Sequence, residues 1–152
     1  ITVAPYMGED SIRPFLEYEN KWTIVLGLTS NEGSKDFEQL HLQDCKLLYE
    51  KVLSRVSEWG TPNNLMFVVG ATKAKDLQHI RTIIPEHFLL VPGVGSQGGS
   101  LEEVSKFGLI KDAGLLINAS RAIIYAENTP TFDKAAAAVA AQYKNEMAVF
   151  LI

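Results

Sequence analysis

Five short apolar runs divide the chain and predict five strands. They are rich in β-branched and aromatic residues and lie at residues 1–3, 22–28, 65–69, 88–91 and 115–117. Their apolar character is continuous instead of alternating, which is typical of parallel strands with both faces covered. We therefore expect each run to form a buried strand of a parallel sheet.

The segments between these runs have the three- and four-residue spacing of amphipathic helices. A long apolar stripe extends from Phe37 to Val56 and includes Cys45, the single cysteine of the chain. Shorter stripes follow the third and fourth runs, and an alanine-dense helix is expected at about residues 132–147. The alternation of strand and helix predicts an α/β fold, in which Cys45 is a small buried hydrophobic residue of a helix.

Two architectures fit this alternation, a doubly wound open sheet and a (β/α)₈ TIM barrel. A barrel binds its ligand at the carboxyl ends of the strands and commonly holds phosphate after the last two. The best candidate ligand loops of this chain also follow its last two strands, which favours the barrel. A complete barrel takes roughly 250 residues, whereas this chain has 152. We therefore expect one domain, 1–152, covering about the last five βα units of a barrel, with strands one to three absent from the sequence.

A glycine-rich loop, Pro92-Gly93-Val94-Gly95-Ser96-Gln97-Gly98-Gly99, follows the fourth strand. Its glycines lack Cβ atoms, so backbone N–H groups can converge on an anion, and Gln97 has both hydrogen-bond donors and an acceptor. Ser100 and Glu103 then form a capping-box pattern at the start of the next helix. The loop is either a phosphate site or a plain turn between strand and helix.

Two further polar segments follow strands. Asn118-Ala119-Ser120-Arg121 comes after the last strand, and the planar guanidinium of Arg121 suits a phosphate. The alternative for Arg121 is a surface ion pair with Glu127 or another acid. Thr29-Ser30-Asn31 follows the second strand and can either contact a polar heterocycle or sugar or form an N-capping turn. In a barrel, both segments lie on the same rim as the glycine-rich loop.

Composition excludes several classes of function. The formal net charge is −4 with scattered Lys and Arg residues, so we expect no nucleic-acid partner and no anionic membrane surface as partner. No run of about 18 apolar residues predicts a membrane span. A single cysteine in a chain that is 47% hydrophobic fits a reduced, cytoplasmic globular protein.

Groups for acid–base or metal chemistry are not apparent. Lys73 and Asp76 come closest to a strand end, but they fit an exposed helix start better. The three histidines have no metal-site spacing, so we expect no metal. The residues alone thus predict a binder of a phosphorylated ligand that lacks the groups to transform it.

The chain resembles the orotidine 5′-phosphate decarboxylase family. Residues 92–99 followed by Asn118-Ala119-Ser120-Arg121-Ala122-Ile123-Ile124-Tyr125 resemble the closing half of these enzymes, and residues 2–12 and 28–34 resemble their longer bacterial branch. The match runs in order across nearly the whole chain. It implies a cytoplasmic, dimeric (β/α)₈ barrel that converts orotidine monophosphate to UMP and CO₂ in pyrimidine biosynthesis, without metal or organic cofactor.

The resemblance also implies roles for individual residues. Gln97 and Arg121 match the family's phosphate-gripping glutamine and arginine, assisted by backbone donors near Ser120 and Gly95, and Ser30 matches the serine that bonds the pyrimidine. The family's catalytic lysines and aspartates lie on its second and third strands, and one aspartate crosses the dimer interface. Those strands have no counterpart here, so we expect no catalytic residue in this chain and no activity of the chain alone.

Two other functions remain open at this point. One is another phosphosugar lyase or isomerase of related barrel fold, since related barrels place different chemistry beside the same phosphate site. The other is a non-catalytic module that binds UMP or phosphate without turnover. A partial barrel would also leave the strand at Ile1 with an unpaired edge, which favours pairing with another chain.

Overall fold

A computed structural model describes residues 1–71, 74–95 and 99–151. Its strands are β1 (Thr2–Val3), β2 (Thr23–Leu28), β3 (Leu65–Val69), β4 (Phe88–Pro92) and β5 (Leu115–Asn118). Its α-helices are α1 (Glu9–Leu16), α2 (Leu48–Ser57), α3 (Ala74–Ile83), α4 (Leu101–Gly108), α5 (Ser120–Ile124) and α6 (Phe132–Ala148). Two 3₁₀ turns, Pro5–Met7 and Glu32–Lys35, complete the described elements. All five predicted strands and the alanine-rich helix are confirmed.

The strands form one sheet in the order β1-β2-β3-β4-β5, and every neighbouring pair is parallel. Each strand therefore lies next to the strand that follows it in the sequence. A doubly wound sheet reverses its strand order at a switch point, whereas consecutive units of a barrel do not. The observed order is that of a barrel segment.

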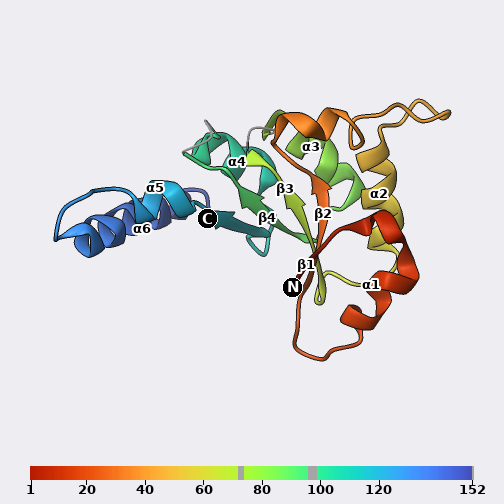
Figure 1. Cartoon of the computed structure of the whole chain (residues 1–152), viewed down its shortest axis with the longest axis horizontal. Coiled ribbons are helices and arrows are strands. Elements are labelled where there is room, and N and C mark those ends of the chain that lie inside the picture. Colours follow the sequence, from red (N-terminus) through yellow and green to blue (C-terminus); the bar gives the residue numbers. More distant parts are fainter. Residues whose placement is uncertain (72–73, 96–98, 152) are drawn as a thin grey trace.

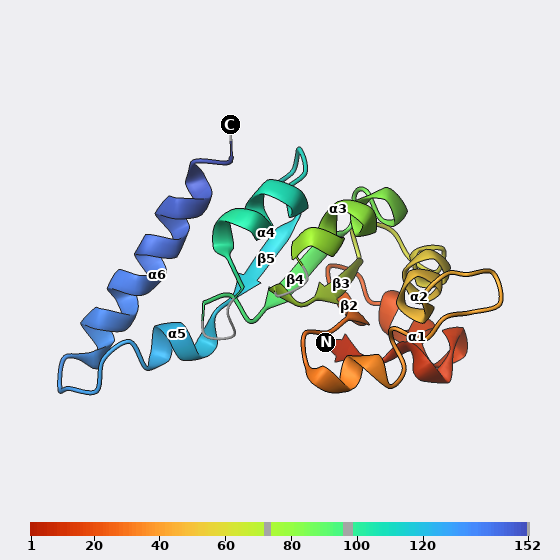
Figure 2. The same cartoon turned by 90° about the horizontal axis from the view of Figure 1, so that it is seen from above.

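The hydrophobic core lies between the sheet and the helices that follow its strands. Figures 1 and 2 show α2, α3 and α4 side by side along the sheet, with α5 and α6 extending beyond β5. Leu53 and Val56 of α2, together with Leu77 and Ile80 of α3, are fully buried against this face. The apolar stripes predicted for these helices thus supply the core that fixes the strand ends.

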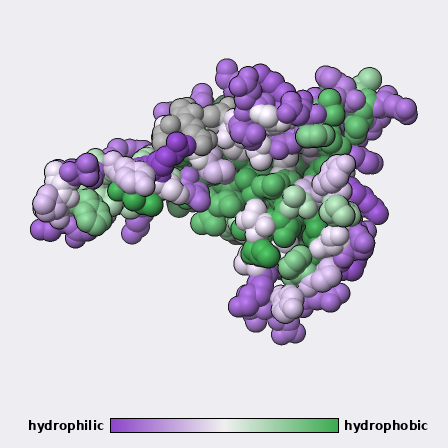
Figure 3. Space-filling model, in the orientation of Figure 1, coloured by the Kyte–Doolittle hydropathy of each residue, from purple (hydrophilic) through white to green (hydrophobic). Residues whose placement is uncertain are grey.

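The second face of the sheet is only partly covered. Burial alternates along β2 and β4, and Leu116 of β5 is 51% exposed, whereas β3 is buried throughout. Figure 3 shows apolar surface at the centre of the molecule. The prediction that both faces of the sheet are covered is therefore wrong for the described part of the chain, because its helices pack chiefly against one face.

The prediction of a continuous helix from Phe37 to Val56 is wrong in its first half. Helix α2 begins at Leu48, and residues 36–47 form a loop in which Phe37 is 65% exposed. Leu42 N–H donates to the Lys46 carbonyl at 2.8 Å, and His41 and Leu47 form an antiparallel bridge. These hairpin bonds replace the helical ones.

Cys45 lies at the turn of this hairpin and is exposed, with φ of +64°. Asp44 Oδ1 accepts from Lys46 N–H at 3.3 Å, so a local side-chain bond competes with the helix here. The prediction that Cys45 is a buried helical residue is therefore wrong. Its left-handed backbone cannot continue an α-helix.

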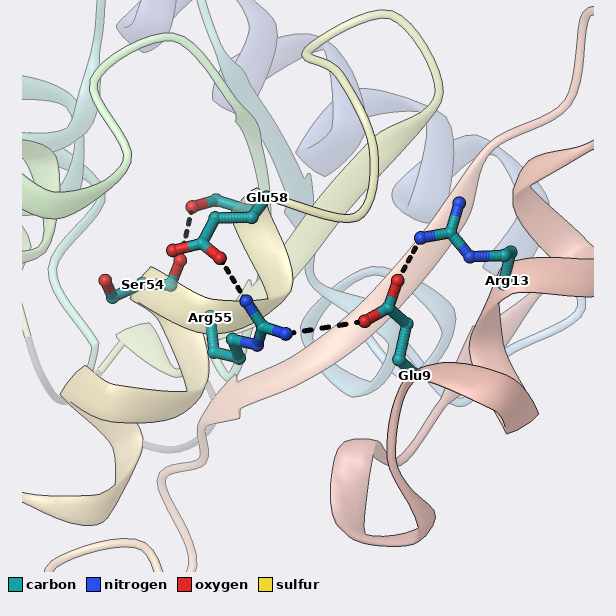
Figure 4. Close-up of polar contacts among 6 residues, drawn as sticks. Glu9, Arg13, Ser54, Arg55 and Glu58 are labelled. Atoms are coloured by element: carbon teal, nitrogen blue, oxygen red, sulfur yellow. Dashed lines mark hydrogen bonds and ion pairs between the residues drawn. The ribbon is translucent and has the colours of Figure 1, made fainter.

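Surface ion pairs join α1 to α2, as Figure 4 shows. Arg55 lies 3.6 Å from Glu9 and also contacts Glu58, while Glu9 pairs with Arg13. Such exposed pairs contribute up to about 1 kcal/mol each. In the part of the chain that the structure describes, no helix has the length and apolar character needed to cross a membrane.

Candidate functional site

The loops at the carboxyl ends of the strands form one rim of the sheet. Because all five strands are parallel, the residues after β2, β3, β4 and β5 all lie at this end. The candidate residues Ser30, Gly95, Ser120 and Arg121 belong to these loops or begin the helix after them. The structure therefore places the described candidates on the same rim, as the sequence predicts.

The loop after β2 lies directly on the end of β3. A Cβ atom on Gly70 would be 2.6 Å from Ser30 Cβ and 2.8 Å from Ser30 N, so a side chain at position 70 would collide with the backbone of Ser30. Gly70 N–H also donates to the Leu28 carbonyl at 2.8 Å. This close approach fixes the half-buried Ser30 at the top of the sheet.

The glycine-rich loop after β4 is closed at its base. Gly95 N–H donates to the Gly99 carbonyl at 3.0 Å, and Val94 and Gly99 form a parallel bridge. A Cβ atom on Gly99 would lie 2.3 Å from Ala71 Cβ, so the base of the loop packs on the residue that follows Gly70. The loops after β3 and β4 are thus in direct contact.

Gly95 connects the same loop to helices α5 and α6. Its φ is +78°, a conformation that favours glycine. A Cβ atom there would be 3.4 Å from Ala122 Cβ of α5 and 2.3 Å from the hydroxyl of Tyr143 in α6. Since Ala122 follows Arg121 directly, Gly95 lies beside the segment that carries the candidate arginine.

Ser120 and Arg121 form the exposed first turn of α5. Ser120 Oγ donates to Asn118 Oδ1 at 2.8 Å. Glu127 contacts Thr131 Oγ1 at 3.4 Å, and among the residues that the structure describes no acid pairs with Arg121. The alternative interpretation of Arg121 as the partner of Glu127 is therefore wrong, and its guanidinium is exposed on the rim.

Glu38 holds the loop after β2 in place, a role that the sequence did not indicate. Thr29 N–H donates to Glu38 Oε2 at 2.7 Å, and the Thr29 hydroxyl lies 2.7 Å from Glu38 Oε1 and 2.6 Å from Asn31 Oδ1. Asn31 occupies the N-cap position of the following 3₁₀ turn without a side-chain cap bond. The carboxylate of Glu38 thus orients the segment that contains Ser30.

Other predicted features can be placed as follows. Ser100 Oγ accepts from Glu103 N–H at 3.2 Å, which confirms Ser100 as the N-cap of α4. Asp76 is half-buried in the first turn of α3. Gln97 and Lys73 lie outside the described residues. Within the described ranges, no three His, Cys, Asp or Glu side chains are grouped as a metal site would require.

Groups with shifted pKa values lie outside the candidate loops. Burial raises the pKa of Tyr49 to about 12. The pKa of Glu50 is lowered by the Leu47 N–H and by His79, although burial acts in the opposite direction. Burial lowers the pKa of Arg81 to about 10, and burial together with Arg81 lowers the pKa of His87.

Arg81 and His87 belong to the opposite, amino-terminal end of the sheet. Arg81 donates to the carbonyls of Gly108 at 2.8 Å, His87 at 2.6 Å, Gly114 at 3.0 Å and Ile84 at 3.3 Å. These bonds join the ends of α3 and α4 to the segments that precede β4 and β5. Their role is structural, since ligands of parallel α/β folds bind at the other end.

Comparison with known proteins identifies the family. The sequence profile described as "Orotidine 5'-phosphate decarboxylase / HUMPS family" matches residues 1–138. The chain belongs to this family. It is 60% identical over 148 residues to an orotidine 5'-phosphate decarboxylase of Christiangramia forsetii, with 97% of this chain and 54% of the relative covered. It is 53% identical over 148 residues to one of Bacteroides fragilis, with the same coverage.

Solved structures support the same assignment. Leishmania donovani UMP synthase superimposes with a TM-score of 0.82 at 39% identity, covering 97% of this chain and 33% of that one. Leishmania donovani OMP decarboxylase superimposes with a TM-score of 0.80 at 36% identity, covering 97% and 56%. The predicted fold class, part of a (β/α)₈ barrel, is confirmed. The chain spans about half the length of the curated relatives that it matches.

Proposed function

We propose that this protein converts orotidine 5′-monophosphate to UMP and CO₂ in pyrimidine biosynthesis. The chain supplies the side of the active site that binds the phosphate and the pyrimidine. The proposal is supported by membership of the orotidine 5'-phosphate decarboxylase / HUMPS family and by the names of the relatives. A phosphosugar isomerase or another lyase of related fold has no comparable support.

One structural observation carries the proposal for the binding site. A continuous series of contacts links Ser30 to the end of β3, Ala71 to Gly99, and Gly95 to the residue after Arg121. Groups suited to a pyrimidine and to a phosphate are therefore joined along one rim. A nucleoside monophosphate carries both a base and a phosphate, so this arrangement supports its binding.

Each candidate residue has a separate role in this proposal. Ser30 bonds the pyrimidine, while Arg121 and Gln97 bind the phosphate together with backbone donors near Ser120 and Gly95. The guanidinium of Arg121 can form two parallel bonds to phosphate oxygens. Binding a group remote from the reacting carbon accelerates the reaction when that binding energy is realised in the transition state.

In this proposal, the decarboxylation step uses catalytic groups that residues 1–152 do not supply. The described residues nearest to the strand ends, 29–31, 70–71, 93–95 and 118–122, include no lysine or aspartate, and the chain covers 54% of the Christiangramia forsetii relative. We therefore infer that residues 1–152 form one domain, inactive alone, and that the protein acts as a cytoplasmic homodimer with shared active sites. The reaction needs no metal or organic cofactor in this proposal.

Mutation of Arg121 tests the proposed function. In the full-length protein, Arg121→Ala should lower kcat/KM for orotidine monophosphate by about 100-fold or more, because each hydrogen bond to a charged group contributes about 1.5–3 kcal/mol. Arg13→Ala, which removes an exposed arginine from α1, is the matched control. Unchanged kinetics of Arg121→Ala would refute its role.

The 152-residue chain provides a second test. UMP should bind to it in isothermal titration, and orotidine monophosphate should not be decarboxylated. Turnover by this chain alone would contradict the inference that catalytic groups lie elsewhere. UMP binding by a full-length protein that shows no turnover would favour a non-catalytic module.

A further inference from the structure

Helix α6 makes one contact with the rim that its composition does not suggest. None of its 17 residues is fully buried. Its half-buried residues form a stripe of Ala135, Ala136 and Val139 in the first part of the helix and Tyr143 and Met147 in the second. Both of these larger side chains pack against the hydrophobic core. Tyr143 is thus the aromatic member of a stripe of otherwise aliphatic residues.

The hydroxyl of Tyr143 lies against Gly95 at the start of the glycine-rich loop. A Cβ atom on Gly95 would be 2.3 Å from Tyr143 Oη and 3.6 Å from Tyr143 Cζ. The hydroxyl oxygen, and not the ring, therefore makes the closest approach. No hydrogen bond joins this hydroxyl to another residue in the described part of the chain.

The contact constrains a position where the backbone is unusually free. Gly93 and Gly95 both have positive φ, at +89° and +78°. Glycine loses more conformational entropy on ordering than any other residue. A rigid aromatic side chain anchored in the core opposes that freedom, because it blocks movement of Gly95 toward α6.

We propose that Tyr143 is a positioning residue for phosphate binding. Its hydroxyl holds Gly95 against α5, so that the backbone of residues 93–95 stays beside the segment that carries Arg121 and both can contact the same phosphate. This role rests on the proposed function of the loop. It predicts that substitution of Tyr143 weakens the binding of ligands that carry a phosphate and leaves the affinity for phosphate-free ligands unchanged.

Binding of UMP and uridine to the full-length protein tests this role. Tyr143→Phe removes only the hydroxyl, and it should weaken UMP binding about fivefold or more while leaving uridine binding unchanged. Tyr143→Ala should weaken UMP binding further. Met147→Ala is the matched control, because Met147 packs against the core from the same helix and is not among the atoms nearest to the Cβ position of Gly95. The control should leave the ratio of UMP to uridine affinity unchanged.

The ratio of UMP to uridine affinity distinguishes a positioning role from a purely structural one. Equal weakening of UMP and uridine, or unchanged UMP binding by Tyr143→Phe, would overturn the proposal. A purely structural role would lower the melting temperature without changing the affinity ratio, and this result would also overturn it. If the wild-type protein fails to decarboxylate orotidine monophosphate but Tyr143→Phe still weakens UMP selectively, the proposed enzyme activity fails and the positioning role stands.

Discussion

The contact between Gly95 and Tyr143 predicts a specific coupling between two substitutions. Gly95→Ala places a methyl group in a left-handed conformation, which costs about 1–2 kcal/mol for a residue other than glycine. The same methyl group would lie 2.3 Å from Tyr143 Oη. Overpacking of this kind costs about 1–3 kcal/mol. Gly95→Ala alone should therefore destabilise the protein by about 2–5 kcal/mol.

Tyr143→Phe should relieve the second of these costs. Without the hydroxyl, the nearest atom of residue 143 to the new methyl group is Cζ at 3.6 Å, which is ordinary van der Waals contact. Tyr143→Phe by itself should change the free energy of unfolding by no more than about 0.5 kcal/mol, since the hydroxyl has no hydrogen-bond partner among the described residues. The free energy of unfolding of the double variant should therefore be about 1–3 kcal/mol higher than that of Gly95→Ala.

Thermal unfolding of the full-length protein measures this coupling in a double-mutant cycle. A change of 1 kcal/mol shifts the Tm of a protein of this size class by about 2–4 °C. The double variant should thus unfold several degrees above Gly95→Ala, which is the opposite of what two independent destabilising substitutions give. Additive effects of the two substitutions would refute the geometry of the contact.

Two further predictions concern the opposite end of the sheet. Arg81→Met should lower the free energy of unfolding by about 3–5 kcal/mol, because it removes the Arg81 hydrogen bonds to four carbonyls, of which that of Gly114 keeps another donor, Leu89 N–H. Arg81→Lys should recover part of this loss, and wild-type stability of Arg81→Met in thermal unfolding would contradict the role of the bonds. His87 is buried with both ring nitrogens unpaired in the described structure, and its pKa is lowered. Since the unfolded chain then binds the proton more readily, stability should fall as the pH drops below about 6.5. Urea unfolding across this range should show the decline in the wild type and in His41→Gln, an exposed control, but not in His87→Phe.

The strands could be predicted from the sequence because burial determines their composition. Residues 65–69 are apolar without interruption, and β3 has the same bounds and is buried on both faces. The same reasoning overestimated the coverage of β4, where every second residue is only half-buried. The sequence of a strand shows that a residue is apolar, but it does not show whether the surface that buries this residue belongs to the described part of the chain.

The loop before α2 could not be predicted from apolar spacing. Phe37 and Leu40 fit the stripe of the following helix, but both are exposed. The signal that competed with the helix was Asp44, whose side chain bonds to the backbone two residues later. Periodicity describes which face a helix would bury and does not measure such local hydrogen bonds.

The candidate site was predictable where it depends on local sequence. Gly95, Ser120 and Arg121 lie within three residues of a strand end, so the parallel arrangement was sufficient to place them on one rim. Tyr143 was missed because its contact joins residues that are 48 positions apart. The available signal was a tyrosine on the half-buried face of an alanine-rich helix, which indicates that the helix packs against something specific there.

The electrostatic character of the rim follows from these contacts. Among the described residues at 29–31, 70–71, 93–95 and 118–122, Arg121 is the only cationic side chain. The remaining donors are backbone N–H groups, hydroxyls and the side-chain amides of Asn31 and Asn118, which do not titrate near neutral pH. A phosphate monoester gains its second negative charge with a pKa of about 6. Changes in phosphate affinity between pH 6 and 8 should therefore follow the protonation of the phosphate ligand and not that of the described rim residues.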